Sequence, residues 1–437
     1  MAYRILSLDG GGSWALVQAR ILLDMYGDIR GHELLRKFDM AIGNSGGSLV
    51  LASLCNDMKL SEVIAVFRNR DQRKEVFSKL TFWEKLNWRN IASLTNVLGP
   101  RYSTERKLKG LIKVLKDKDH LYREGAIALP IVETAMNKLP AIIKKESLQL
   151  LIVGFEYFKE RVFFFRSNTN SKADSFSSGK FLEVSLANAI HSSSNAPINY
   201  FDQPAEISMN LLGDVKKNTR KNWFWDGAVS GFNNPVLAGL VEAVANNNID
   251  LKECCILSIG TGTGSRVVLT DYKYSTDPED QAIYEKNKNN PLTVTSDASG
   301  FLKDITKMST SILSDPPDSA TFIAYTFIDP TLSNNANIVR INPSFKPVKD
   351  NTGLFVPPSV YNKLPDGNKS FKSLLALDMD AVEDNQVDLI NDLCDKFIIT
   401  DNSDCLPNKL IRGDANGKYL GQRSYKEAKE KWFKDCN

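Results

Sequence analysis

The chain contains 437 residues, of which 42% are hydrophobic and 24% are charged. This composition is typical of a globular protein and excludes a disordered, collagen-like or disulfide-scaffold chain. Because 55 Lys and Arg residues nearly balance 52 Asp and Glu residues, the net charge is only +3, which argues against a dedicated nucleic-acid-binding protein.

The first 60 residues predict two consecutive strand–helix units. An apolar run over residues 3–8 is typical of a strand, and the glycines at 10–12 end it before a helical pattern over 15–27. A second strand-like run at 38–42 precedes a buried helix at 48–55. Strands that alternate with helices predict a mostly parallel, doubly wound sheet.

The rest of the chain continues to mix helical and strand-like patterns. We predict helices over 57–125, 235–244, near 297–328 and at 385–397, and strands at 128–133, 148–155, 162–165, 255–259 and near 337–341. Residues 266–296 are polar and predict a long loop or a lid.

The strongest functional signal is the sequence Gly-Asn-Ser-Gly-Gly at residues 43–47. It fits the pattern G-x-S-x-G and lies between a predicted strand and a predicted helix, which is the context of a nucleophile elbow. In such a turn the serine hydroxyl stands at the end of the strand, and the following N–H groups and the helix dipole can hold an oxyanion. Ser45 is therefore a candidate nucleophile, and a glycine-rich turn with an incidental serine is the alternative.

A second glycine-rich turn, Asp-Gly-Gly-Gly at residues 9–12, also joins a predicted strand to a predicted helix. Its N–H groups can converge on an anion, either as an oxyanion hole or as a phosphate cradle. A P-loop would end in Gly-Lys-Ser/Thr, but Ser13 and Trp14 follow here. A dinucleotide-binding fold accepts Ala15 as its third small residue but leaves the turn at 43–47 unexplained. A bare tight turn is the third possibility.

Asp226 is the candidate partner of the serine. It follows the aromatic run at 223–225, a position where Asp commonly forms a turn. The chain has three histidines, His32, His120 and His191. None follows Asp226, so a triad in the order Ser–acid–His is excluded, and a carboxylate in a dry, partly apolar site can take the serine proton instead. A triad that uses His191, with Asp226 or Asp214 orienting the imidazole, is the alternative.

The sequence offers little for a metal site or a membrane span. The six cysteines contain no Cys-x-x-Cys pair, so we expect no zinc site, and the serine chemistry requires no metal or cofactor. The N-terminal apolar run is too short for a signal peptide, and no window reaches about 18 apolar residues. We therefore expect a cytoplasmic or peripheral membrane protein.

Taken in chain order, these motifs resemble the patatin-like phospholipases, which are lipid acyl hydrolases with a Ser–Asp dyad. The matching blocks are Leu-Ser-Leu-Asp-Gly-Gly-Gly at 6–12, Gly-Asn-Ser-Gly-Gly at 43–47, Ser-Ser-Ser-Asn-Ala-Pro at 192–197, Asp-Gly-Ala at 226–228 with Asn-Asn-Pro at 233–235, and Leu-Ser-Ile-Gly-Thr-Gly at 257–262. The resemblance covers about residues 3–264 and continues more loosely through 339–341 and 377–380. It departs at Trp14 and Ala15, where the family often has a basic residue and then glycine.

The resemblance implies a three-layer α/β sandwich with a mostly parallel central sheet and helices on both faces. It also implies a phospholipase A-type reaction on esters of glycerophospholipids or other glycerolipids. The implied site consists of the catalytic Ser45 and Asp226, the oxyanion-hole glycines Gly10, Gly11, Gly12 and Gly46, and the motif residues Gly43, Gly47, Gly227 and Ala228. A phosphate- or nucleotide-binding module and a catalytically silent relative are the alternatives.

The resemblance also suggests a division of the chain and possible lipid contacts. We expect a patatin-like core over 1–265, a continuation of that domain over 266–400, and a tail with a short helix over 401–437. Aromatic and basic residues at 77–89 predict either an interfacial lid or core aromatics, and the basic stretch at 216–221 either meets phosphate headgroups or is a solvated loop. A further group of lysines predicts a solvated helix face, or else a lipid-headgroup surface: Lys107, Lys109, Lys113, Lys116 and Lys118.

Overall fold

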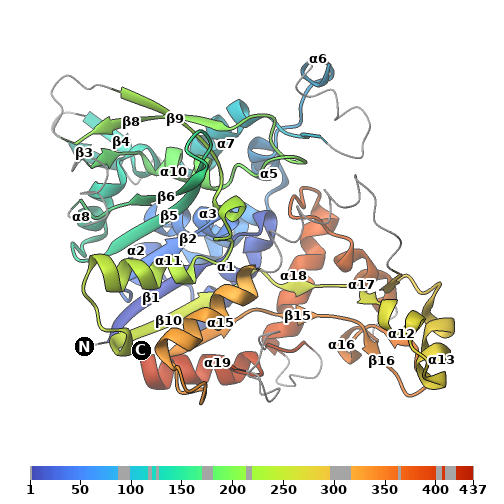
Figure 1. Cartoon of the computed structure of the whole chain (residues 1–437). Helices are drawn as coiled ribbons and strands as arrows, with labels where there is room; N and C mark the ends of the chain where they lie inside the picture. The colour runs from blue at the N-terminus through green and yellow to red at the C-terminus, as the bar shows by residue number, and fades with distance from the viewer. Residues whose placement is uncertain are drawn as a thin grey trace.

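A central sheet of nine described strands runs through the molecule, with helices against both faces (Figure 1). The computed structural model describes residues 2–86, 99–116, 121–124, 127–169, 181–212, 219–295, 316–362, 366–399, 406–408 and 420–436. The strand order is β14-β10-β1-β2-β5-β9-β8-β7, and β6 also pairs with β5. These strands are β1 Tyr3–Leu8, β2 Met40–Gly43, β5 Gln149–Glu156, β6 Arg161–Arg166, β7 Leu182–Glu183, β8 Ala205–Leu211, β9 Thr219–Asp226, β10 Cys254–Ile259 and β14 Ile338–Ile341.

The sheet has a parallel half and an antiparallel half. The strands β14, β10, β1, β2 and β5 run parallel to one another, as the alternation of strands and helices predicted. The strands β6, β7, β8 and β9 run antiparallel to their neighbours, which was not predicted. In β9, for example, this direction was not predicted because the first half of the strand is exposed and polar and lacks the continuous apolar run of a buried parallel strand.

Helices cover the sheet on its two sides and enclose two apolar cores. Leu6 and Leu8 of β1 lie in the core formed with α1, α3, α4 and α18, whereas Ile5 lies in the core formed with α11 and α15. This division follows from the alternation of side chains along a strand. The helices are α1 Leu16–Tyr26, α2 Gly31–Leu35, α3 Ser45–Cys55, α4 Leu60–Arg68, α5 Arg70–Val76, α6 Phe82–Lys85, α7 Thr104–Leu115, α8 Leu139–Ile143, α10 Leu186–Ser193, α11 Val236–Val241, α12 Thr270–Tyr274, α13 Pro278–Asn287, α15 Pro316–Ile328, α16 Ser359–Asn362, α17 Gly367–Leu375, α18 Asp384–Ile399 and α19 Tyr425–Lys431.

Two stretches differ from the prediction. The segment 57–125, expected to be helical, ends in the strand β3, and the segment 266–296, expected as a loop or lid, contains the helices α12 and α13. The side chain of Asp277 caps α13 and Pro278 begins it, but the helix has no apolar face, so the periodicity could not reveal it. The short strands outside the central sheet are β3 Leu121–Glu124, β4 Ile127–Pro130, β11 Thr263–Gly264, β12 Val267–Val268, β13 Thr293–Val294, β15 Ser344–Phe345, β16 Val348–Lys349 and β17 Phe355–Val356.

The C-terminal part of the chain is built into the same fold. β14 pairs in parallel with β10, so residues after 265 complete the central sheet. Within the segment 401–437, α19 packs near β14, and Trp432, which follows it, stacks on Phe38 with ring centroids 5.8 Å apart. The two ends of the chain lie close together in Figure 1. Near these ends, the guanidinium group of Arg4 donates to the carbonyl oxygen of Cys436 at 2.6 Å.

Candidate active site

The register of the sheet brings the ends of β2 and β9 together. β6 pairs with one edge of β5, so β2 and β9 share the other edge. β2 runs parallel to β5 and ends with Gly43 opposite Ile152, whereas β9 runs antiparallel and ends with Asp226 opposite Gly154. Two strands that approach from opposite directions therefore stop at neighbouring positions of β5, and Ser45 follows directly after one of them.

Ser45 occupies the sharp turn that was predicted for a nucleophile. Its φ is 47°, in the left-handed region that residues with a Cβ seldom adopt, and α3 begins at this residue. A Cβ on Gly47 would lie 2.4 Å from the carbonyl oxygen of Leu8, and a Cβ on Gly46 would lie 2.5 Å from the carbonyl oxygen of Gly12. Since real Cβ atoms do not approach so closely, both glycines are needed for α3 to pack against the first strand and its turn.

Asp226 is buried, and several groups hold its carboxylate. The backbone N–H of Ala228 donates to Oδ1 at 2.9 Å, and the side-chain amide of Asn44 donates to the same oxygen at 3.2 Å. The hydroxyl of Ser45 also acts on this carboxylate, because it lowers the pKa of Asp226. A Cβ on Gly227 would lie 2.4 Å from the amide oxygen of Asn44, so this position has no room for a side chain. Burial raises the pKa of Asp226 above its usual value, and the hydrogen bonds oppose this rise.

The C-terminal turn of α10 supports both members of this pair. The backbone N–H of Ser45 donates to the hydroxyl of Ser193 at 2.9 Å, and the backbone N–H of Asp226 donates to the carbonyl oxygen of Asn195 at 3.0 Å. Both supporting residues belong to the block at 192–197, which the sequence marked only through the family resemblance. One short segment therefore fixes the positions of the serine and of the aspartate relative to each other.

A small cavity adjoins Ser45, and we call it the serine cavity. Its volume is about 20 Å³. A second cavity of about 40 Å³ lies between α3, α4, α5 and α7, and most of its lining side chains are aliphatic or aromatic. Both cavities are lined by Gly12, Leu49, Val76 and Phe77, so they adjoin each other. Apolar side chains therefore surround the space between the serine and the helical layer.

The four glycines expected in an oxyanion hole have different surroundings. The N–H of Gly10 donates to the carbonyl oxygen of Asn233 at 2.8 Å and so is not free to bind an oxyanion, which corrects the expectation for this residue. Gly11 lines a different, larger cavity of about 310 Å³. Gly12 and Gly46 line the serine cavity, and neither N–H has a hydrogen-bond partner among the residues that the structure describes.

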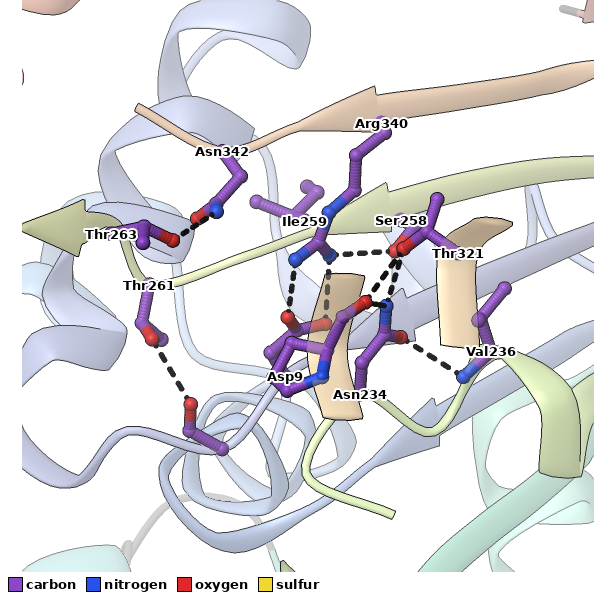
Figure 2. Close-up of polar contacts among 12 residues, drawn as sticks. Asp9, Asn234, Val236, Ser258, Ile259, Thr261, Thr263, Thr321, Arg340 and Asn342 are labelled. Atoms are coloured by element: carbon purple, nitrogen blue, oxygen red, sulfur yellow. Dashed lines mark hydrogen bonds and ion pairs between the residues drawn. The ribbon is translucent and has the colours of Figure 1, made fainter. Parts of the chain in front are cut away.

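A buried ion pair anchors the start of the first glycine-rich turn (Figure 2). Arg340 of β14 donates to the two carboxylate oxygens of Asp9 at 2.9 and 2.6 Å, and to the hydroxyl of Ser258 on β10 at 2.8 Å. Burial raises the pKa of Asp9, and Arg340 opposes this rise. The pair ties the C-terminal ends of β1, β10 and β14 together at the base of the turn.

Three N–H groups of the first glycine-rich turn are already bonded within the protein. A cradle needs several N–H groups that converge on one anion. Here the N–H groups of Gly10, Ser13 and Trp14 all donate to carbonyl oxygens of the protein. The phosphate- or nucleotide-binding interpretation therefore loses its main support.

His191 does not contact the serine–aspartate pair. It lies in α10, where burial and the nearby Lys107 hold the pKa of its imidazole well below the usual value. Its Nδ1 is buried without a hydrogen-bond partner in the described part of the chain. Across the same residues, no hydrogen bond joins the imidazole to Ser45 or to Asp226, so the geometry favours the carboxylate as the base.

The remaining candidates lie elsewhere. His32 is in α2, where Nε2 lies 2.7 Å from the carbonyl oxygen of Cys55, and His120 and Asp214 are outside the described residues. Within the described ranges, no group of three or more His, Cys, Asp or Glu side chains is placed to bind a metal ion. Among the helices described, none combines the length and the apolar character that crossing a membrane requires.

The environment predicted for Lys107, a residue of this region, was wrong. Expected on a solvated face, its side chain is fully buried and donates to the carbonyl oxygen of His191 at 2.8 Å and to the amide oxygen of Asn195 at 3.1 Å. The sequence carried a signal, because Lys107, Leu111 and Leu115 follow one another at helical spacing and share the buried stripe of α7. By contrast, the neighbouring Lys109 and Lys113 are exposed, whereas Lys118 is outside the described residues.

A C-terminal segment also contributes to the site. Met379 lines the serine cavity, and its carbonyl oxygen accepts the N–H of Ser13 at 2.9 Å. The flanking Asp378 and Asp380 form ion pairs with Arg101 at 2.8 and 3.0 Å. No pattern in the sequence placed these residues at the site, apart from the loose resemblance at 377–380.

Comparison with known proteins agrees with the geometry. The family model described as Patatin-like phospholipase matches residues 6–240, which is more than half of the chain. Among solved structures, VipD from Legionella pneumophila has 11% sequence identity and a TM-score of 0.31, and the match covers 90% of this chain and 67% of VipD. The type III effector protein ExoU has 11% identity and a TM-score of 0.27, with 75% of this chain and about half of ExoU (54%) covered. No curated protein sequence matches the chain.

Proposed function

The chain belongs to the patatin-like phospholipase family, and on that premise we propose that it is a serine lipid acyl hydrolase with a Ser45–Asp226 dyad. The observation that carries this proposal is the placement of a serine, held at a φ of 47°, beside a buried carboxylate whose pKa the serine hydroxyl lowers. A strained turn exposes the hydroxyl for attack, and burial raises the pKa of the carboxylate into a more basic range.

In the first step, the Oγ of Ser45 attacks the carbonyl carbon of a fatty-acyl ester while Asp226 takes the hydroxyl proton. The carbonyl oxygen becomes an oxyanion, and the N–H groups of Gly12 and Gly46 are the donors that best fit its position. When the tetrahedral intermediate collapses, the bond to the alcohol breaks and Asp226 returns the proton to the leaving oxygen. The acyl group remains on the serine.

In the second step, water attacks the acyl-enzyme. Asp226 takes a proton from the water, the same two N–H groups hold the second oxyanion, and the fatty acid leaves as Oγ of Ser45 recovers its proton. With a glycerophospholipid as substrate, the products are a lysophospholipid and a fatty acid, which is a phospholipase A reaction. The apolar side chains that line the serine cavity and its neighbour offer the acyl chain a dry environment.

A lipid surface is the expected location of this substrate. In α6, the aromatic side chains of Phe82 and Trp83 are 65% and 79% exposed, and the adjacent Leu86 is 43% exposed. This helix projects from the body of the molecule at the top of Figure 1. Exposed aromatic and aliphatic side chains on a projecting helix can enter the headgroup region of a bilayer. In the proposed function, α6 therefore binds peripherally to the lipid surface.

A fluorophosphonate probe tests the nucleophile directly. We expect one covalent adduct, located by peptide mass spectrometry at Ser45, and no adduct in Ser45→Ala. Ser61→Ala is the matched control, because the Ser61 hydroxyl is bonded to Asp28 at the surface of α4 and is not part of the site. Absence of any adduct in the folded wild-type protein would indicate a catalytically silent relative.

Turnover tests the reaction. Phosphatidylcholine vesicles are incubated with the protein, and the released fatty acid and lysophospholipid are measured by mass spectrometry. Loss of the nucleophile typically lowers kcat by about 10⁴–10⁶-fold, so Ser45→Ala should release no product above background. If this variant kept more than about a tenth of the wild-type rate, another residue would be the nucleophile.

A further inference from the structure

Lys107 is an ammonium group placed in the protein interior with a complete set of acceptors. Its side chain is fully buried, and Nζ donates to the carbonyl oxygen of His191 at 2.8 Å, to Oδ1 of Asn195 at 3.1 Å and to the hydroxyl of Ser194 at 3.4 Å. The ring of Phe201 lies with its centroid 4.3 Å from Nζ. Three acceptors match the three N–H bonds of an ammonium ion, which has no capacity to accept.

The acceptors of Lys107 belong to the segment that positions the dyad. His191 lies in the last turn of α10, where carbonyl groups lack partners within the helix and favour a cation. Asn195 binds the lysine through its side chain and binds the backbone N–H of Asp226 through its own carbonyl oxygen. Lys107 is therefore linked through Asn195 to the backbone of Asp226.

Charge links the two residues as well. Burial lowers the pKa of Lys107 well below its usual value, whereas Asp226 raises it. In turn, Lys107 is among the groups that hold down the pKa of Asp226 against its burial. Lys107 also acts on His191 of α10, because burial and this lysine both lower the pKa of the imidazole. In the described part of the chain, α5, which also packs against α7, contributes no group that acts on Lys107.

We propose that Lys107 is a positioning residue of the dyad, which holds the C-terminal turn of α10 against Asp226 and balances the charge of its carboxylate. This inference rests on the proposed function, in which Asp226 is the general base. The lysine itself lines neither the serine cavity nor the second cavity, so it acts through the residues that it binds and through its charge.

The pH dependence of kcat/KM distinguishes this role from simple packing. The base must be ionised, so activity rises as pH increases through the pKa of Asp226. Lys107→Met removes the positive charge, and the rise should move to higher pH by about one unit. Lys107→Arg keeps the charge and should leave the rise close to its wild-type position. Lys109→Met is the matched control, because Lys109 pairs with Glu105 on the exposed side of the same helix.

A purely structural lysine would give a different profile. Lys107→Met would then lower kcat/KM by the same factor at every pH and leave the rise where it is in the wild type. That result would overturn the charge balance. A rise that moved to lower pH would overturn it as well, since it would mean that the lysine had disfavoured the ionised carboxylate.

A double-mutant cycle tests the same proposal without any activity. Urea unfolding is measured for Lys107→Met alone and in the presence of Asp226→Asn. If the two charges balance, Lys107→Met in the wild-type background leaves the buried carboxylate of Asp226 without an opposite charge. In the Asp226→Asn background, the same substitution removes an ammonium group that already lacks an opposite charge. Lys107→Met should therefore change the unfolding equilibrium constant by a factor at least about tenfold smaller in the Asp226→Asn background than in the wild-type background.

The outcomes of the cycle separate this proposal from the proposed function. Equal effects in the two backgrounds would overturn the charge balance even if the protein hydrolyses lipid. A clear coupling in a protein without hydrolase activity would support the charge balance between Lys107 and Asp226 while the proposed function failed. If Lys107→Met alone does not fold, folding of the double variant supports the balance, and failure of both variants to fold contradicts it.

Discussion

Asp9 and Asp226 are two buried aspartates in similar positions with different partners. Each stands at the end of a strand and directly before a glycine, and burial raises the pKa of both. The carboxylate of Asp9 receives two N–H groups of Arg340, one on each oxygen. The carboxylate of Asp226 instead accepts an asparagine amide and a backbone N–H, and the hydroxyl of Ser45 lowers its pKa.

The difference shows that the partners, and not the burial, decide what a buried carboxylate can do. A guanidinium group does not give up its proton at physiological pH, so Asp9 stays an anion that fixes the geometry of the turn. A hydroxyl can give up its proton when the carbonyl carbon of a substrate accepts its oxygen, so Asp226 can act as a base. We therefore expect substitutions at the Asp226 site to affect turnover most and substitutions at the Asp9 pair to affect stability most.

The largest expected effect is on turnover. Asp226→Asn should lower kcat/KM by about 10²–10⁴-fold, because an amide cannot take the proton of Ser45. The rate is measured on phosphatidylcholine vesicles, and circular dichroism checks that the protein is folded. Asp28→Asn on the surface serves as the control. If Asp226→Asn retained most of the activity, Asp226 would belong with Asp9 as a structural carboxylate.

The Asp9 pair should govern stability. Arg340→Met leaves the carboxylate of Asp9 buried without its cation and should lower the free energy of unfolding by about 3–5 kcal/mol. Urea denaturation measures this change. Arg68→Met is the control, since Arg68 lies at the surface, 3.9 Å from Asp388, and such a substitution changes stability by about 0.5 kcal/mol or less. A similar small change for Arg340→Met would contradict the anchoring role of the pair.

The pH dependence of the wild-type protein sharpens the same contrast. The protonated form of Asp226 cannot act as a base, and its folded pKa is raised by burial. The value of kcat/KM should therefore rise with pH above the ordinary aspartate pKa of about 3.9, and not at or below it. Initial rates from pH 3.5 to pH 8 on a soluble ester measure this. A rise centred below the ordinary value would mean that the hydrogen bonds outweigh burial.

Lipid binding should respond to the exposed helix α6. Replacing both Phe82 and Trp83 with Ala should weaken binding to phosphatidylcholine vesicles by at least about tenfold, because an apolar side chain that leaves water contributes about 1.5–3 kcal/mol. Vesicle sedimentation measures the bound fraction. The control is Tyr274→Ala, since Tyr274 in α12 is 70% exposed on another element. If the double variant bound vesicles as strongly as the control, the hypothesis that α6 binds lipid would be contradicted.

The smallest effect is expected at His191. Since its imidazole contacts neither member of the dyad in the described structure, His191→Ala should lower kcat/KM by less than about tenfold. A loss above about a hundredfold in a protein with an unchanged circular dichroism spectrum would make the histidine the base. Asp226 would then orient the imidazole of His191 and would be a fixed anion, as Asp9 is.

The features that could be predicted from the sequence depend on local chemistry. Ser45 was identified because a glycine-flanked turn between a strand and a helix leaves few other conformations, and the structure indeed holds it at positive φ. The parallel strands were recognised because strands buried on both faces are continuous apolar runs. Asp226 was identified less directly, by eliminating a histidine and by resemblance.

The features that were missed depend on contacts between distant segments. The N–H of Gly10 is occupied by the carbonyl group of Asn233, which no pattern near Gly10 reveals. The approach of Met379 to the serine cavity is likewise fixed by ion pairs and hydrogen bonds of its neighbours. Lys107 was predicted to be solvated because lysine side chains are usually exposed. Its helical spacing from Leu111, however, places it on the buried face of α7.

The position of β10 limits where the chain can be cut. The family model ends at residue 240, but β1 pairs along its whole length with β10, from Tyr3 opposite Cys254 to Leu8 opposite Ile259. A recombinant fragment that stops at residue 240 would present the N–H and C=O groups of β1 as an open, apolar sheet edge, a template for intermolecular pairing. Such a fragment should therefore form insoluble aggregates, and shortened versions for expression need to retain β10 and β14.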